Sequence, residues 1–322
     1  MPQEMRMPAR EIELKLEVDA TGFERLKDHP RLRDGAGTPE TRPLRTVYHD
    51  TADAALWQAG LIARMRDLGD RRLLGIKSRS RAGGLMDRRE HEEEIAGETI
   101  DIKHLRHTPL RDLLDAAAID GPLQPLFATE IHRTAWYLPV PQGRIEIALD
   151  QGEIVCGDRR EAIREVELEL QGGSAAELFH LALALQADIP RLRILTRSKS
   201  DRGYALVHAA EPAGRKAEPT DLTPDMTVEA AVEAIARSCL GHFLANEPIL
   251  RVSRHPEAVH QMRVALRRLR TAFALFKPLL HTAEGEALRT EMRWLLGDLG
   301  AARDMDVFLA EVIDPAAEAL PD

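Results

Sequence analysis

The chain has 322 residues, 44% hydrophobic and 30% charged, the composition of a folded globular protein of about two domains. Its formal net charge of -9 argues against nucleic-acid binding through bulk positive charge, so an anion site must be local. Cys156 and Cys239 lie far apart and form no CxxC pattern, which argues against a disulfide framework and a structural zinc site. The sequence shows no apolar signal core and no apolar run of membrane-spanning length, so we expect a cytoplasmic protein with no membrane partner.

Up to about residue 208 the sequence consists mostly of short alternating runs separated by turn signals, which predicts β-strands. The expected strands cover residues 11–18, 42–50, 60–67, 72–78, 87–95, 131–138, 144–151, 153–159 and 164–170. Helices are expected over residues 21–27, 108–117 and 174–186, and hairpin turns over 68–70, 82–84 and 141–143, where glycine can adopt positive φ. This order predicts an α+β domain over residues 1–208, built on an antiparallel sheet.

The second part of the chain has a different pattern. Residues 209–222 are rich in proline, glycine and charge and show no periodicity, so we interpret them as a linker. Beyond them apolar residues recur at helical spacing, with helices expected over residues 228–247, 256–279, 284–299 and 304–313. Residues 223–322 are therefore expected to form an all-α helical-bundle domain.

The first expected strand, EIELKLEV at residues 11–18, has one charged and one apolar face. Side-chain alternation separates Glu11, Glu13, Lys15 and Glu17 from Ile12, Leu14, Leu16 and Val18. A single strand of this kind usually turns its charges to solvent, because antiparallel sheets commonly have one solvated face. The question is whether the charged face looks outward or inward.

The recurrence of this pattern favours the inward direction. Arg64 and Arg66 make one strand basic, whereas Glu165, Glu167 and Glu169 make another acidic. An outer surface usually mixes charges of both signs, and like charges two residues apart repel unless an opposite charge lies between them. We infer that acidic strands face basic ones across a water-filled interior, with the apolar faces packed outward. Carboxylates suit Mg²⁺ or Mn²⁺, and arginine and lysine suit phosphate, so the pattern indicates a site for metal-complexed polyphosphate.

The ordered series of motifs resembles the CYTH superfamily, the triphosphate tunnel metalloenzymes. The motifs are ExExK at residues 11–15, RMR at 64–66, Lys77, RxExE at 88–92, Arg133, IEIALDQGEI at 145–154, EVELEL at 165–170 and SKSDRGYAL at 198–206. The resemblance covers about the first two hundred residues. It implies an eight-stranded antiparallel tunnel, a closed barrel with flanking helices, in which acidic residues bind one or two divalent metals and basic residues hold a triphosphate.

The resemblance also implies roles for individual residues. The metal-side candidates are Glu11, Glu13, Asp150, Glu165, Glu167 and Glu169, with Mg²⁺ or Mn²⁺ as cofactor. The phosphate-side candidates are Lys15, Arg64, Arg66, Lys77, Arg88, Arg133, Lys199 and Arg202. The catalytic candidates are Glu11, Glu13, Lys15, Glu165 and Glu167. Lys15 is also a candidate for neutralising neighbouring carboxylates, and a one-residue register slip would exchange Arg88 for Arg89.

The implied chemistry is attack by water on a terminal phosphorus, with the protein supplying position and charge neutralisation. The family includes enzymes for inorganic triphosphate, thiamine triphosphate, RNA 5′-triphosphate ends and ATP. The low aromatic content of 4% favours inorganic triphosphate, hydrolysed to pyrophosphate and phosphate, with Trp57 and Trp136 as the remaining candidates for contact with an organic ring. The alternatives are a class IV-type adenylyl cyclase, a thiamine-triphosphatase and a non-catalytic polyphosphate-binding protein.

The helical part carries a local basic surface. His260, Arg263, Arg267 and Arg270 recur at helical spacing, and residues 251–293 contain nine Lys or Arg against four Asp or Glu. These residues, with LGDLGAARDMDVF at 296–308, resemble the start of a CHAD domain, which implies polyphosphate binding. A CHAD domain needs a longer chain than residues 223–322 provide, so this domain is expected to be incomplete. Its apolar faces would then favour a homodimer.

Overall fold

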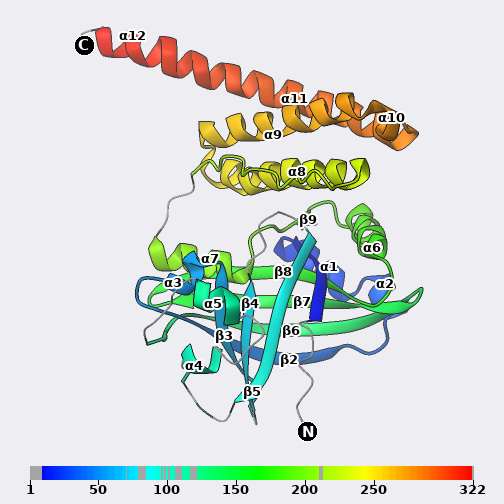
Figure 1. The fold of residues 1–322 in the computed structure, drawn as a ribbon, viewed down its shortest axis with the longest axis vertical. Coiled ribbons are helices and arrows are strands. Elements are labelled where there is room, and N and C mark those ends of the chain that lie inside the picture. The colour runs from blue at the N-terminus through cyan, green and yellow to red at the C-terminus, as the bar shows by residue number, and fades with distance from the viewer. Residues whose placement is uncertain are drawn as a thin grey trace. The chain divides into compact units, whose positions relative to one another are not determined.

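The computed structural model describes residues 9–69, 71–78, 85–95, 97, 99–100, 102–105, 111–116, 122–209 and 213–320. Contacts between residues divide the chain into two compact units, of which one ends at residue 210 and the other covers residues 211–322 (Figure 1). Each unit has its own hydrophobic core.

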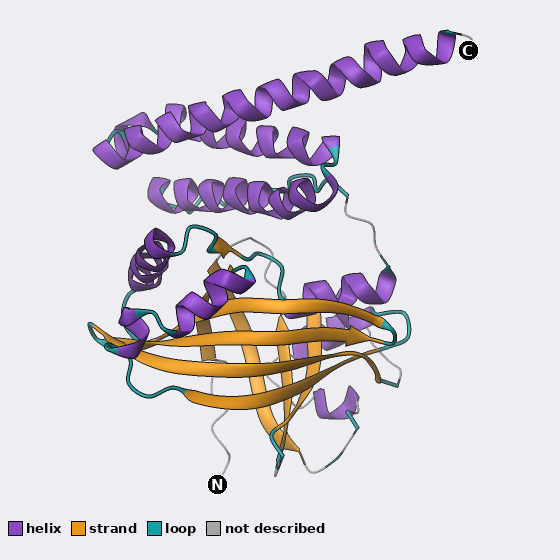
Figure 2. Cartoon of the chain, turned by 180° about the vertical axis from the view of Figure 1, so that it is seen from behind, coloured by secondary structure: helices purple, strands orange, loops and turns teal. Residues whose placement is uncertain are grey.

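Within the described residues the first unit contains nine strands. They are β1 (Ala9–Glu17), β2 (Glu40–Asp50), β3 (Leu61–Asp67), β4 (Arg72–Ser78), β5 (Leu85–Ile95), β6 (Gln124–Val140), β7 (Gly143–Cys156), β8 (Arg159–Gln171) and β9 (Arg193–Ile194). They pair in the order β5, β4, β3, β2, β6, β7, β8, β1 and β9, and β1 also pairs antiparallel with β5. The family resemblance implied eight strands; β9, which has two residues and pairs with β1 at Leu16 and Glu17, was not predicted. Figure 2 shows the strands as one strongly curved sheet.

The central strands are longer than the sequence predicted. Residues 144–151 and 153–156, expected in two separate strands, lie in one continuous strand, β7, whereas residue 159 begins β8. Strand β6 extends well beyond the expected residues 131–138 at both ends. Gly152 lies inside β7, where an added Cβ would come within 2.0 Å of the Glu130 carbonyl oxygen on β6. Glycine here permits close approach of two backbones and does not break the strand. In the turn between β6 and β7, Gln142 has the positive φ of 64° that glycine was expected to supply.

The first unit also contains seven helices in its described residues. They are α1 (Ala20–Lys27), α2 (Pro30–Arg33), α3 (Ala55–Gln58), α4 (Ile102–Leu105), α5 (Arg111–Ala116), α6 (Ala175–Asp188) and α7 (Lys199–His208). Ser174 caps α6, its hydroxyl accepting a hydrogen bond from the Ala176 amide at 3.3 Å. The turn expected over residues 82–84 and parts of the helix expected over 108–117 lie outside the described residues.

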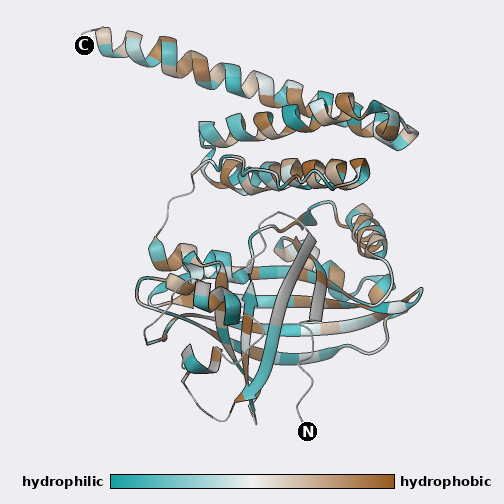
Figure 3. Cartoon of the chain, in the orientation of Figure 1, coloured by the Kyte–Doolittle hydropathy of each residue, from teal (hydrophilic) through white to brown (hydrophobic). Residues whose placement is uncertain are grey.

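The apolar faces of the strands pack outward beneath helices, as the sequence predicted. Leu14 and Leu16 of β1, and Val18 directly after it, belong to a core that includes Phe23 of α1 and Leu178 of α6. A second core joins the apolar face of β3 and β4 to Leu56, Leu105 and Leu114. Figure 3 shows the alternation of hydrophilic and hydrophobic residues along the strands. Because side chains alternate, these two cores leave the charged faces of the same strands turned inward.

Helix α7 was not predicted, and it packs against the inner side of the strands. Ser198 and Asp201 form a capping box at its first turn. An added Cβ at Gly203 would lie 2.0 Å from the Phe127 ring, so only glycine lets the helix approach β6 this closely. The Tyr204 hydroxyl donates to Asp50 Oδ2 at 2.6 Å. These contacts fix the start of α7, and with it Lys199.

The second unit is helical, as expected. It consists of α8 (Val228–Ser253), α9 (Pro256–Leu275), α10 (Lys277–Leu280), α11 (Ala283–Phe308), a π-helical turn η1 (Leu309–Ile313) and α12 (Asp314–Ala319). The helices expected over residues 284–299 and 304–313 are one continuous helix that passes into the π-helical turn. Helix α8 continues past the expected end at residue 247 and contains Pro248 within it. Within the described chain, no helix combines the length and the apolar character needed to cross a membrane.

Residues expected to form a linker make specific contacts with the second unit. The Asn246 side chain accepts from the Arg215 amide at 2.8 Å and donates to the Arg215 carbonyl at 2.9 Å. His242 Nε2 donates to the same carbonyl at 3.0 Å. Thr220 donates to Ser238 at 3.0 Å. The described residues from 213 to 220 are therefore held along α8.

Candidate functional site: a cavity with two charged walls

A cavity of about 410 Å³ lies on the inner side of the strands of the first unit. Its lining comes from β1, β2, β3, β4, β5, β6 and β8 and from the start of α7. The lining includes Glu13, Lys15, Arg64, Arg66, Lys77, Glu92, Arg133, Glu167, Glu169 and Lys199. Strands far apart in sequence thus bring most of the predicted residues to one place.

One wall of the cavity is cationic. Among the side chains that the structure describes, Arg64 and Arg66 of β3 and Lys77 of β4 lie around one carboxylate, Glu92 of β5. Arg64 Nη2 donates to Glu92 Oε1 at 2.8 Å, and Arg66 Nη1 lies 3.8 Å from the same oxygen. Gly75 faces this pair, and an added Cβ there would lie 3.0 Å from Arg64 Nε. Counted over the described side chains, three cations around one carboxylate leave an excess of positive charge, which is what an anion requires.

The pKa of Arg66 reports that excess. The neighbouring charge of Arg64, together with burial, lowers the pKa of Arg66 to about 10. Arg66 Nε is buried and makes no hydrogen bond within the described part of the chain. Glu92 was not among the predicted site residues, although it belongs to the motif at residues 88–92. The sequence could have indicated Glu92, because it lies two residues from Glu90 and on the same strand face as residue 88.

The other wall is acidic. Asp150 of β7 and Glu165 of β8 are fully buried and absent from the described lining of the cavity, whereas Glu167, which lines it, has a side chain that is 12% exposed. Arg133 donates to Asp150 from Nε at 2.7 Å and from Nη2 at 2.6 Å, and also to Glu167. Lys15 lies 2.9 Å from Glu13 and also contacts Glu167. Lys15 is therefore paired with two carboxylates in this structure.

Lys199 lies among three carboxylates of this wall. Its Nζ is 2.7 Å from Asp150 Oδ2 and 3.0 Å from Glu167 Oε1, and it also contacts Glu165. Burial disfavours the charged amine, but the three carboxylates outweigh it and raise the pKa of Lys199 above its ordinary value. Although burial works against ionisation, Lys15, Lys199 and Arg133 together hold the pKa of Glu167 well below its usual range. The wall is an ionised network of opposite charges.

Several predicted residues lie differently from expectation. Arg133 and Lys199, assigned to the phosphate side, are paired with carboxylates in this structure. Arg202 is absent from the described lining of the cavity; it pairs with Glu161 at 2.6 Å and with Glu165 at 3.2 Å, behind the acidic wall. The side chains of Glu11 and Arg88 lie outside the described residues. Thr46, Tyr48 and Thr129 line the cavity and were not predicted, because nothing in their strands distinguishes them from core residues.

The acidic wall fits a divalent cation in the kind and placement of its ligand atoms. Asp150, Glu165 and Glu167 each offer a carboxylate oxygen, and these atoms lie within 4.8 Å of one another. Carboxylate oxygens are the ligands that Mg²⁺ and Mn²⁺ prefer. The ammonium of Lys199 already stands among them as a cation.

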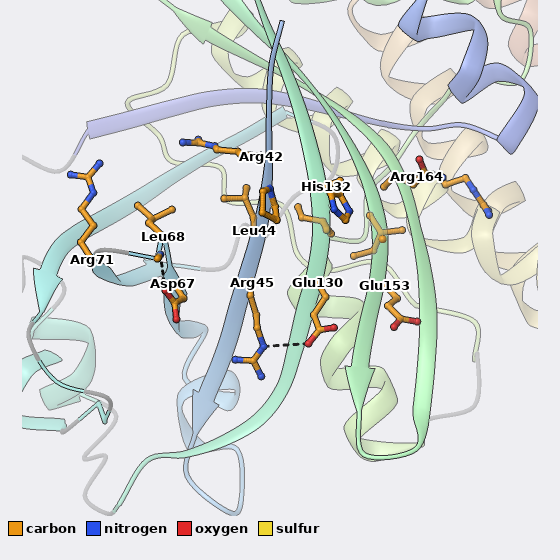
Figure 4. Close-up of a pocket in the computed structure, with 16 residues that line it drawn as sticks. Arg42, Leu44, Arg45, Asp67, Leu68, Arg71, Glu130, His132, Glu153 and Arg164 are labelled. Carbon is orange, nitrogen blue, oxygen red and sulfur yellow. Dashed lines mark hydrogen bonds and ion pairs between the residues drawn. The ribbon is translucent and has the colours of Figure 1, made fainter.

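A larger groove of about 1130 Å³ lies elsewhere on the first unit, across β2, β6 and β7 (Figure 4). Its acidic side chains include Glu130, which lies 3.2 Å from Arg45, and Glu153, which lies 2.8 Å from Arg160. Arg45 and Glu130 are exposed and alternate with the inward residues of their strands. This groove contains none of the predicted catalytic residues.

The basic residues predicted in the second unit do not form one exposed face. Arg267 and Arg270 on α9 are exposed, whereas His260 and Arg263 are half-buried. Arg263 Nη1 donates to the Leu296 carbonyl of α11 at 3.3 Å, and an added Cβ at Gly300 would lie 2.6 Å from it. Arg263 is thus held between two helices.

Comparison with known proteins agrees with this geometry. Residues 9–204 match the CYTH domain and residues 234–322 match the CHAD domain. The first match covers more than half of the chain, which therefore belongs to the CYTH family.

Similar proteins have been named and solved. A Haemophilus influenzae protein named inorganic triphosphatase is 30% identical over 167 residues, which span 51% of this chain and 46% of that protein. A candidate adenylyl cyclase from Hippeastrum, described as having dominant triphosphatase activity, is 20% identical; the likeness covers 62% of this chain and 95% of that one, with a TM-score of 0.47. A candidate adenylate cyclase from Bacillus halodurans is also 20% identical, covering 60% and 96%, with a TM-score of 0.41.

Proposed function

We propose that the first unit hydrolyses inorganic triphosphate to pyrophosphate and phosphate, in a tunnel closed by the pairing of β1 with β5, with Mg²⁺ or Mn²⁺ as cofactor. The observation that carries this proposal is the cavity itself, in which the cationic wall of Arg64, Arg66 and Lys77 faces an acidic wall. A triphosphate fits the first wall and a divalent cation the second. The name of the Haemophilus influenzae relative supports the same substrate.

The chain's own residues account for binding and positioning. Arg64 and Arg66 offer guanidinium groups that hold phosphate oxygens in fixed geometry, and Lys77 adds a point charge. A bound divalent cation, held by Asp150, Glu165, Glu167 and the neighbouring Glu13 or Glu169, would add positive charge at the phosphate oxygens. Glu13 lines the cavity and, among the described residues, contacts one cation, Lys15. Glu167 contacts three cations and is thus more fully neutralised. We therefore assign to Glu13 the role of orienting the attacking water.

The aromatic side chains near the cavity favour an inorganic substrate over a nucleotide or thiamine triphosphate. Tyr48 stacks on Phe127 with ring centroids 4.5 Å apart, and Trp57 stacks on Tyr204 at 4.1 Å. Trp136 is buried in the outer core. The two tryptophans considered as ring contacts are therefore committed to packing.

The experiment that tests this function measures phosphate release from tripolyphosphate, ATP and thiamine triphosphate, each with Mg²⁺, Mn²⁺ or EDTA. Tripolyphosphate should be turned over fastest, and EDTA should abolish turnover. Equal turnover of the three substrates would refute the preference for inorganic triphosphate. Activity that survives EDTA would refute the metal requirement. Cyclic AMP formed from ATP would identify a cyclase, and binding without turnover a receptor.

Two variants connect the activity to the two walls. Arg64→Ala and Glu165→Gln should each abolish hydrolysis while the protein still unfolds cooperatively. Arg45→Ala is the matched control, because Arg45 is an exposed arginine on a neighbouring strand whose side chain points away from the cavity. Activity retained in both Arg64→Ala and Glu165→Gln would contradict the proposed site.

For the second unit, we propose a polyphosphate-binding role for residues 223–322, joined to the catalytic domain of residues 1–208 by residues 209–222. The exposed arginines Arg267 and Arg270 support this role, with His260 and Arg263 at the edge of the same helix face. Arg267→Glu with Arg270→Glu should weaken binding of long-chain polyphosphate by the full-length protein without changing tripolyphosphate hydrolysis. Sedimentation of the same protein would test the expected homodimer.

A further inference from the structure

The amine of Lys199 occupies the place that a divalent cation needs. The three carboxylates that it contacts, Asp150, Glu165 and Glu167, are the same three whose oxygens lie within 4.8 Å of one another. An ammonium group and a divalent cation repel each other at such distances, and the burial of the wall leaves little water to screen them. The two cations therefore cannot share these oxygens.

Lys199 also borders the anion-binding part of the cavity. It is the first residue of α7, and it lines the same cavity as Arg64 and Arg66. Its side chain is 11% exposed, and its flexible stem carries a charge that can turn from one wall toward the other. In contrast, Arg133 is held by a fork of two hydrogen bonds to Asp150 and cannot turn without breaking both.

We propose that Lys199 couples the two halves of the site: without a metal its ammonium neutralises the three carboxylates, and a divalent cation displaces it toward the cationic wall, where it adds to the triphosphate site. This inference rests on the metal requirement of the proposed function. Each ligand then favours the other, because the cation frees a positive charge for the triphosphate and the triphosphate draws that charge from the carboxylates. Free protein would hold neither ligand tightly.

The test is the affinity of the full-length protein for Mn²⁺ alone, measured by calorimetry and by electron paramagnetic resonance. Removing the competing ammonium in Lys199→Gln should tighten Mn²⁺ binding by about tenfold or more. The same substitution should weaken binding of tripolyphosphate. Lys77→Gln is the matched control, because it removes a lysine from the opposite wall: it should weaken tripolyphosphate binding and leave Mn²⁺ affinity within about twofold. Unchanged or weaker Mn²⁺ binding by a folded Lys199→Gln protein would overturn the proposal.

A second measurement uses the unsubstituted protein in case Lys199→Gln does not fold. The ¹⁵N ammonium resonance of Lys199, assigned by its loss in Lys199→Arg, should shift on saturation with Mg²⁺; a resonance that stays in place overturns the displacement. The outcomes separate the two proposals. Metal-dependent hydrolysis with no gain in Mn²⁺ affinity refutes the coupling and leaves the function intact. A gain in affinity without hydrolysis supports the coupling and refutes the function.

Discussion

Arg133 and Asp150 are joined by two hydrogen bonds, from Nε to Oδ1 at 2.7 Å and from Nη2 to Oδ2 at 2.6 Å. The motif series assigned these residues to opposite ligands, the phosphate and the metal. They occupy paired positions on β6 and β7, so their side chains emerge on the same face of neighbouring strands. The carboxylate is fully buried, and its partners Lys199 and Arg133 hold its pKa below the ordinary value against the effect of burial.

This pair predicts a large loss of stability on removal of Arg133. Among the described residues, Arg133→Ala leaves the buried charge of Asp150 with Lys199 as its remaining partner, and should lower the free energy of unfolding by about 3 kcal/mol. Arg66→Ala is the control, because it removes an arginine from the wall that has excess positive charge, and should cost little or stabilise the protein. Urea unfolding of both variants measures the difference. Equal losses of unfolding free energy in the two variants would contradict the difference in charge balance between the two walls.

Gly75 should matter for binding more than for folding. In Gly75→Ala the new methyl group would lie 3.0 Å from Arg64 Nε and 3.2 Å from its Cγ, so the arginine must shift from its position beside Glu92. Tripolyphosphate affinity should fall by about tenfold, the effect of one lost charge-assisted hydrogen bond, while the melting temperature changes little. Gly297→Ala is the control, since no atom lies within 4 Å of its added Cβ and alanine favours the helix. An unchanged affinity would show that Arg64 does not set the phosphate site.

Tyr204 should stabilise the helix that carries Lys199. Its hydroxyl is buried and donates to Asp50 Oδ2, which also accepts from the Trp57 amide at 3.0 Å. Tyr204→Phe should lower the free energy of unfolding by about 2 kcal/mol, the usual contribution of a hydrogen bond to a charged group. Tyr137→Phe, which removes a half-buried hydroxyl from β6, is the comparison and should change stability by less than about 0.5 kcal/mol. Thermal unfolding distinguishes them, and similar effects would contradict the role of the Asp50 contact.

His242 predicts that the second unit weakens in mild acid. Burial lowers the pKa of His242 below its ordinary value of 6.5, and Arg268 acts in the same direction, whereas its contacts with Gln261 and the Arg215 carbonyl oppose the shift. Because the folded pKa is the lower one, the unfolded chain binds the proton first. The stabilising contribution is thus complete above about pH 6.5 and is lost as the pH falls from there through the folded pKa.

Hydrogen exchange of α8 and α9 in the full-length protein, between pH 7.5 and 5.5, measures this loss separately from the first unit. His242→Gln should reduce the dependence of the opening free energy on pH. His281→Gln is the matched control, since His281 lies in the same unit with an exposed side chain. The same dependence in both variants and the parent protein would exclude His242 as its source.

The sequence alone determined which strand faces carry charge and which are apolar. Alternation is a local property of extended chain, so the outward packing of Leu14 and Leu16 and the inward direction of Glu13 and Lys15 follow once the strand pattern recurs. The sign of each strand was also readable, and it predicted a basic wall at Arg64 and Arg66 opposite an acidic one at Glu167. The helix α7 was within reach too, because Ser198 and Asp201 form a capping-box pattern.

Tertiary structure decided which charge neutralises which. Arg133, Lys199 and Arg202 have the same sign as Arg64, and nothing in their local sequence shows that they pair with carboxylates of β7 and β8. Arg64 and Arg66 instead lie beside the same carboxylate, Glu92. Those pairings depend on the register of β6 with β7 and on the packing of Gly203 and Tyr204 that places the start of α7. A pattern along one strand fixes the direction of a side chain, but its partner lies on another strand or helix, and distance between them is set by the whole fold.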